Sequence, residues 1–145
     1  MHIFLSTPIS CFNNKAELSN YKQSIFMLLA AMKKKYTVCA EIEAITDKED
    51  YDSPDKSITT DLQSIMMCDT FILHYPARVP SSALIELGFA IAFNKRILII
   101  TPSKETLPYL ALGIPSMNKQ SMIIESDYYD GDFTDKIMKY LEQDC

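Results

Sequence analysis

The chain has 145 residues, of which 48% are hydrophobic and 23% are charged, and its formal net charge is −5. This length can enclose one sizeable core, so we expect a single domain spanning residues 1–145. The acidic balance without a basic stripe argues against nucleic acid as a partner, and no apolar run is long enough to cross a membrane. The chain opens on an apolar strand instead of a signal peptide, so we expect a cytoplasmic protein. Its cysteines are scattered, so we expect no metal site, and we also expect no cofactor.

Strand-like and helix-like segments alternate along the chain. In order, we expect a strand at His2–Leu5, a helix at Lys15–Lys35, a strand at Tyr36–Ile42, a helix at Ser57–Cys68, a strand at Thr70–Tyr75, a helix within Pro80–Ala92, a strand at Ile97–Thr101, a short helix at Glu105–Leu112, a strand at Ser121–Ile124 and a helix at Phe133–Gln143. This alternation is typical of an α/β three-layer sandwich. For five strands it favours a flavodoxin-like, mainly parallel sheet with strand order 2-1-3-4-5.

That strand order predicts where a ligand binds. The crevice of a doubly wound sheet opens where the order reverses, beyond the carboxyl ends of the first and third strands. The loop Ser6–Asn14 therefore faces the segment Pro76–Ser82. The hydroxyl side chains expected near this crevice are Ser6, Thr7, Ser81 and Ser82.

One carboxylate, Glu86, lies in an otherwise apolar helix. Because the helix is apolar on all sides, we expect it to be buried, and a buried carboxylate is paired, neutralised or functional. Glu86 misses the register of a capping box for either serine at the helix start, and no Lys or Arg lies at helical spacing from it. Interaction with the helix N-terminus is the remaining structural alternative to a functional role.

Three segments resemble the nucleoside 2-deoxyribosyltransferase family and its hydrolytic relatives, the 2′-deoxynucleoside 5′-phosphate N-hydrolases. These segments read I-F-L-S-T-P-I at residues 3–9, D-L-Q-S-I-M-M-C-D at 61–69 and S-S-A-L-I-E-L-G-F-A-I-A-F-N-K-R-I-L-I-I-T at 81–101. The resemblance runs from the first strand to about Asn118. Its most specific part is E-L-G-x-A-x-A-x-x-K, preceded upstream by Asp61.

The resemblance implies a mechanism. Glu86 attacks the anomeric carbon of a nucleoside and forms a glycosyl-enzyme intermediate, which a nucleobase or water then resolves. Asp61 lies near the nucleophile and helps to protonate or orient the departing base. The alternative for Asp61 is a structural one, in which an acid at a helix start stabilises the helix dipole.

The resemblance also implies binding residues. The loop of Ser6, Thr7, Pro8 and Ile9 corresponds to the turn that holds sugar and base. Asn118 falls where the family completes a neighbouring protomer's site, which implies a homodimer or a higher homo-oligomer with shared sites. The alternative for Asn118 is an ordinary turn asparagine.

The chain departs from the family pattern at three positions. Phe4 replaces a common tyrosine, Pro80 replaces the aspartate of the transferases, and Ser82 replaces a glycine. The missing aspartate argues against transfer among unphosphorylated nucleosides. Hydroxyls at a helix N-terminus suit a phosphate, and the basic side chains that could add charge are Arg78 and Lys15.

The sequence therefore predicts N-glycosidic cleavage or base exchange on a nucleoside or nucleoside 5′-monophosphate, through a covalent intermediate on Glu86. Two alternatives remain open. One is a NAD-derived nucleotide glycohydrolase resembling TIR domains, and the other is a non-catalytic sensor that binds a nucleotide. For two further polar residues, Asp69 and His74, we expect structural roles at a turn and in a strand, respectively.

Overall fold

The computed structural model describes residues 1–43 and 52–143. Its sheet has five strands in the order β2-β1-β3-β4-β5, and every neighbouring pair is parallel. The strands are β1 (His2–Ser6), β2 (Thr37–Ala40), β3 (Thr70–His74), β4 (Arg96–Thr101) and β5 (Met122–Glu125). The predicted doubly wound order is confirmed.

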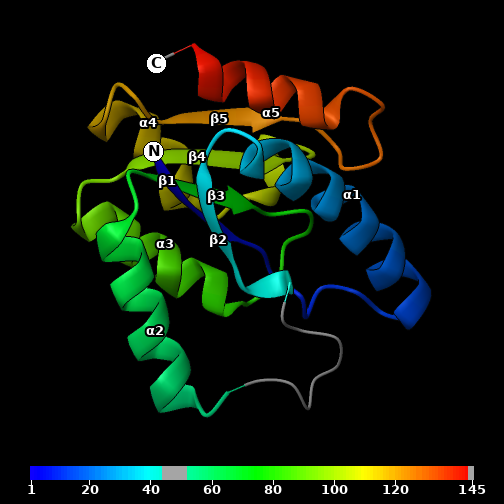
Figure 1. The fold of residues 1–145 in the computed structure, drawn as a ribbon, viewed down its shortest axis with the longest axis horizontal. Coiled ribbons are helices and arrows are strands. Elements are labelled where there is room, and N and C mark those ends of the chain that lie inside the picture. The colour runs from blue at the N-terminus through cyan, green and yellow to red at the C-terminus, as the bar shows by residue number, and fades with distance from the viewer. Residues whose placement is uncertain (44–51, 144–145) are drawn as a thin grey trace.

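Helices cover both faces of the sheet. They are α1 (Lys15–Lys33), α2 (Pro54–Met67), α3 (Ser82–Ala92), α4 (Ile114–Met117) and α5 (Phe133–Glu142), with 3₁₀ turns η1 (Glu41–Glu43), η3 (Lys104–Thr106) and η4 (Tyr109–Gly113). Figure 1 shows α1 and α5 on one side of the sheet and α2 and α3 on the other. Within the described residues, no helix combines the length and the apolarity that a bilayer crossing requires.

Alternation along the strands divides the interior into two cores. Ile3 and Leu5 of β1 face the layer of α1 and α5, whereas Phe4 between them packs with residues of α2 and α3. All residues of β3 are buried, as expected for a strand covered on both faces. The cores fix β1 and β3 side by side, and their carboxyl ends meet at one edge of the sheet.

Two predicted elements differ from the structure. The segment predicted as a helix at Glu105–Leu112 forms two 3₁₀ turns, because Pro108 has no amide hydrogen and Leu107 before it is extended at ψ 151°. The strand predicted at Tyr36–Ile42 ends earlier, at Ala40, where a 3₁₀ turn begins. That early end matters for the site, because the first residue of the turn is Glu41.

The expectation that the Glu86 helix is buried on all sides is wrong. Ser81 caps α3 by accepting a hydrogen bond from the Ala83 amide, at 3.2 Å. One face of α3 packs on the sheet, while Ile85 is 57% exposed and Phe93 38% exposed. A helix in an outer layer has only one face for the sheet, so part of its apolar surface stays open.

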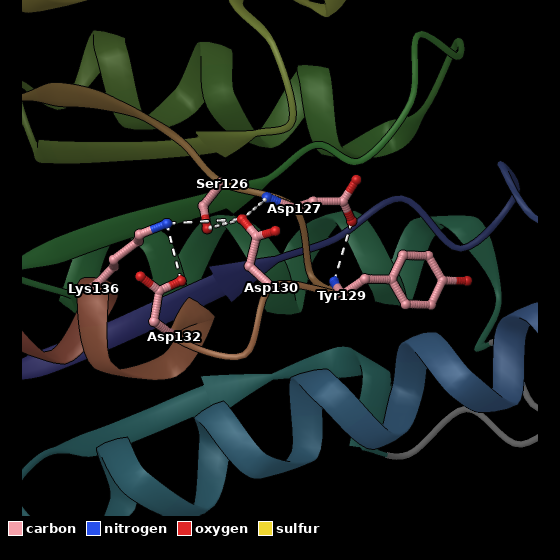
Figure 2. A network of polar contacts seen from close by, with 6 residues as sticks. All are labelled: Ser126, Asp127, Tyr129, Asp130, Asp132 and Lys136. Atoms are coloured by element: carbon pink, nitrogen blue, oxygen red, sulfur yellow. Dashed lines mark hydrogen bonds and ion pairs between the residues drawn. The ribbon is translucent and has the colours of Figure 1, made fainter.

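A polar network holds the turn between β5 and α5 (Figure 2). Asp130 accepts hydrogen bonds from the Ser126 hydroxyl at 3.1 Å and from the Asp127 backbone amide at 3.0 Å. Its carboxylate also lies 3.8 Å from the Lys136 ammonium. The turn places Tyr128 edge-on against Tyr21, with ring centroids 5.0 Å apart. The β5–α5 turn thus packs against the helix that follows the first loop.

Candidate active site

A cavity of about 480 Å³ opens at the carboxyl ends of β1 and β2, beside α2 and α3. Its size suits a small-molecule ligand. Of the residues predicted from the sequence, its lining contains Ser6, Thr7, Ile9, Asp61, Ser81, Ser82 and Glu86. Pro8 is not part of this lining; it is buried, and its carbonyl oxygen accepts a hydrogen bond from the Cys11 thiol at 3.3 Å.

Glu86 points inward from the first half of α3. Only 7% of its surface is exposed, and the described residues that line the cavity include no lysine or arginine. The pKa of Glu86 is raised to about 7, mainly because the carboxyl is buried. The nearby Ser6 hydroxyl acts to lower this pKa, and the negative charge of Asp61 acts to raise it. The Ser6 hydroxyl is buried and forms no hydrogen bond within the described residues. Among the described residues, that nearby hydroxyl is the one side chain that lowers the pKa of this buried carboxyl.

Asp61 faces the same cavity from α2. The helix begins at Pro54, three residues earlier than the predicted Ser57, so Asp61 is its eighth residue. A helix-dipole effect is confined to the first turn, so the helix-dipole interpretation of Asp61 is wrong. The side chain is instead buried, at 8% exposure, and its carboxyl oxygen lies within 4.8 Å of one on Glu86. The structure thus brings together the two acids that the sequence had paired.

A third carboxyl, Glu41, was missed by sequence reasoning. It lies directly after β2, and one of its oxygens lies within 4.8 Å of oxygens on both Asp61 and Glu86. Its carboxyl shares a hydrogen bond with Asp61. Glu41 is exposed as a residue, but partial burial of its carboxyl group raises the pKa to about 8, and the hydrogen bond and charge of Asp61 add to that rise. The sequence does contain a signal, because Glu41 is an acid that directly follows a strand at the edge of the sheet where the crevice is predicted. The predicted strand ran on to Ile42, so Glu41 was placed inside it and was not considered for the site.

Three carboxyl oxygens at this spacing are also the kind of ligand that hard divalent cations take. Binding such an ion requires all three groups to be deprotonated. The raised pKa values of Glu41 and Glu86 oppose this near neutral pH. Without a cation, Glu41 and Glu86 therefore tend to keep their protons near neutral pH, and a bound cation would have to displace them.

The basic residue Arg78 does not reach the cavity lining. Its guanidinium donates hydrogen bonds to the carbonyl oxygens of Glu105 and Leu107, at 3.1 and 3.2 Å. It therefore anchors the turn after β4, and the prediction that it adds charge for a phosphate is not supported. Of the two serines at the start of α3, Ser81 already caps the helix, whereas Ser82 is exposed.

Asn118 lies at the opposite edge of the sheet within this chain. It shares a separate surface hollow with Asp69 and Arg96, at the amino ends of β3 and β4. Its amide donates to the Lys95 carbonyl oxygen at 3.3 Å, and its carbonyl oxygen accepts from the Gln120 amide at 2.9 Å. Asn118 thus makes the turn that its alternative interpretation described, and a contribution to a neighbouring protomer's site stays a prediction.

The remaining two polar residues have structural roles as predicted, although Asp69 bonds to a neighbouring strand instead of making a turn. Asp69 accepts a hydrogen bond from the His2 amide at 2.7 Å and ties the starts of β1 and β3 together. His74 is fully buried, and its Nδ1 lies 2.6 Å from the Tyr21 hydroxyl. Burial lowers the pKa of His74 to about 3, so the imidazole is neutral at physiological pH.

The chain matches no family model and no curated protein sequence. Its fold is similar to that of the CMP N-glycosidase BcmB from Clostridium botulinum, with a TM-score of 0.68 and 24% identity over 97% of this chain and 99% of that chain. It is also similar to a conserved protein from Enterococcus faecalis V583, with a TM-score of 0.69 and 12% identity over 100% and 99% of the two chains. A 2-desoxiribosyltransferase from Leishmania mexicana has a TM-score of 0.50 and 20% identity over 70% of this chain and 65% of that chain. These likenesses establish a common fold.

Proposed function

We propose that this protein cleaves or exchanges the N-glycosidic bond of a nucleoside or nucleoside 5′-monophosphate, with Glu86 as the nucleophile. The observation that carries this proposal is the position of Glu86. It is a buried carboxyl that faces a ligand-sized cavity, accompanied in the lining by Glu41, Asp52 and Asp61 and by no described lysine or arginine. A sugar cation developing at C1′ is the kind of charge that this arrangement stabilises.

The spacing of the acids supports a covalent route. Enzymes that displace a glycosidic leaving group with retention place two carboxyl groups about 5 Å apart, whereas inverting enzymes leave room for a water between them. The oxygens of Glu86 and its neighbours lie within 4.8 Å of one another. This distance favours direct attack of Glu86 on C1′, with a second carboxyl placed for proton transfer.

Two proteins with this fold carry names that fit the proposal. One is a CMP N-glycosidase, and the other is a 2-desoxiribosyltransferase. The former acts on a nucleotide, so we keep both the nucleoside and its monophosphate as substrate classes. Hydroxyl groups of the first loop and of the start of α3, which line the cavity, are the groups we propose to bind sugar and phosphate; they are Ser6, Thr7, Ser81 and Ser82.

We also propose that two or more copies assemble. Large apolar side chains are exposed on the helices beside the cavity and on the segment 109–117, among them Ile58, Ile85, Tyr109, Leu110 and Met117. Surfaces of this kind commonly mark interfaces. Light scattering should therefore give at least twice the monomer mass. Mixing the Glu86→Gln variant with the Asn118→Ala variant should recover activity that neither variant has alone. A monomer, or failure of the mixed variants to complement, would contradict a shared site.

The function is tested by incubating the protein with nucleosides, their 5′-monophosphates and NAD, and measuring free base by chromatography. We expect base release from at least one nucleoside or monophosphate, lost by about 10⁴-fold or more in Glu86→Gln. Acid-quenched protein should carry a sugar adduct on the peptide that contains Glu86, as detected by mass spectrometry. Release from NAD alone would favour the TIR-like alternative. Binding without turnover in the wild type would favour the sensor.

A further inference from the structure

We propose that Glu41 is the proton donor to the departing base. This inference rests on the glycosidic cleavage proposed above and assigns it a third catalytic residue. Glu41 lies on neither helix of the sequence motif, and no feature of that motif identifies it.

The position of Glu41 supports this role. Its backbone is fixed by the end of β2, whose last residue Ala40 pairs with Leu5 of β1. Its carboxyl lines the same cavity as Glu86, so a ligand in contact with one can reach the other. Of the three clustered acids, Asp61 and Glu86 are buried and Glu41 is exposed. The nucleophile therefore sits deep in the cavity, and Glu41 sits nearer its mouth, where a departing base must pass.

The surroundings of Glu41 explain why it holds a proton. The groups that face it are the carboxyls of Asp61 from α2, Glu86 from α3 and Asp52 just before α2, with the Cys39 thiol on β2. All the carboxyls are acidic, and a hydrogen bond between two carboxyl groups requires a proton on one of them. Its neighbour Glu43 differs, because it forms an ion pair with Lys33 at 2.6 Å and does not line the cavity.

The proposed step balances as follows. The C1′–N bond breaks with its electron pair on the base, the Glu41 proton moves to a ring nitrogen, and a Glu86 oxygen bonds to C1′. Water then adds its oxygen to C1′ and gives its proton to the Glu41 carboxylate, while the C1′–O bond breaks and its electrons return to Glu86. A nucleoside and water thus become a free base and a free sugar, and both carboxyl groups end as they began.

The test compares the wild type with Glu41→Gln and with the matched control Glu43→Gln, on two substrates. One is a nucleoside cleaved by the wild type, and the other is the 4-nitrophenyl glycoside of the same sugar, whose leaving group departs without a proton. Glu41→Gln should lower kcat/KM on the nucleoside by about 10²- to 10⁴-fold. On the aryl glycoside the loss should stay within about tenfold, and Glu43→Gln should match the wild type on both.

The pH profile gives an independent readout. For the wild type, kcat/KM on the nucleoside should fall above about pH 8, where Glu41 loses its proton, and that fall should be absent on the aryl glycoside. Equal losses on the two substrates would overturn the proposal and make Glu41 a positioning residue. Unchanged nucleoside cleavage in Glu41→Gln would also overturn it, as would wild-type activity that requires Mg²⁺ and is abolished by a chelator.

Failure of the proposed function is distinguishable from failure of this inference. If the wild type releases base from no substrate, the glycosidic proposal fails, and the donor role fails with it. Infrared spectroscopy then still reports on the proton itself. The carboxylic acid C=O band at pH 7 should be weaker in Glu41→Gln than in Glu43→Gln. An unchanged band would show that Glu41 is ionised and cannot donate.

Discussion

Two buried titratable groups, one at the end of a strand and one on a helix, differ in what surrounds them. His74, the last residue of β3, lies 2.6 Å from the Tyr21 hydroxyl and is enclosed by aromatic rings that include Phe133. Glu86 faces a cavity and two other acids. Both pKa values are shifted toward the neutral form by burial.

The difference shows when a perturbed pKa indicates function. The pKa of His74 is low, yet the residue does not line the Glu86 cavity, so its neutral ring acts as part of the core. The pKa of Glu86 is also shifted toward the neutral form, in this case upward, but Glu86 lines a cavity that a ligand can reach. The described lining of that cavity contains no positive charge that would balance the ionised carboxylate. A substrate that develops positive charge at C1′ can supply that balance.

The largest effect among the tests of this comparison is expected from Asp61→Asn. Asp61 shares a hydrogen bond with Glu41, and its negative charge raises the pKa of that neighbour. The variant should therefore lower kcat by about 10²-fold and move the alkaline fall in kcat/KM toward lower pH. Steady-state kinetics from pH 5 to 9 checks both. If the variant unfolds instead, the role of Asp61 is in the fold of α2 and not in the chemistry.

The fold and part of the site follow from the sequence because their signals are local. Apolar runs such as β3 and β4 identify strands buried on both faces, and the alternation with helices gives the sheet order. Glu86 stands out because it is one charge in an apolar helix. The pairing of Asp61 with it depends on the spacing in a family resemblance, and the structure brings both into one cavity.

Other features depend on contacts between distant segments. Glu41 meets Asp61 and Glu86 only because β2 lies at the sheet edge beside β1, and nothing in its own sequence neighbourhood shows that proximity. Arg78 looks like a free cation in the sequence, but the carbonyl groups of the turn after β4 occupy it. These side chains were misjudged because their partners lie far away along the chain.

A smaller effect is expected on stability from Glu86→Gln. The pKa of Glu86 is raised from 4.5 to about 7, so the folded state binds its proton more tightly than the unfolded state does. Below pH 4.5 the carboxyl is neutral in both states, and the cost of burying its charge develops as pH rises and is complete above about 7. The amide should therefore stabilise the fold by about 3 kcal/mol at pH 8 and by less than about 0.5 kcal/mol at pH 4.5. Urea denaturation at the two pH values measures this, and a variant less stable than the wild type at pH 8 would contradict a buried, unpaired charge.

The smallest effect is expected from Tyr21→Phe, on the other side of the comparison. The change removes the hydroxyl that lies beside His74 Nδ1 and leaves a buried polar atom without its partner. The free energy of unfolding should fall by about 1–2 kcal/mol at pH 7.5, while kcat on the cleaved substrate stays within a few-fold of the wild type. Tyr129→Phe is the matched control, because Tyr129 is 64% exposed and its loss of a hydroxyl should change stability little. If Tyr21→Phe instead abolished activity without loss of stability, Tyr21 and His74 would take part in the reaction. The contrast between a structural His74 and a functional Glu86 would then be wrong.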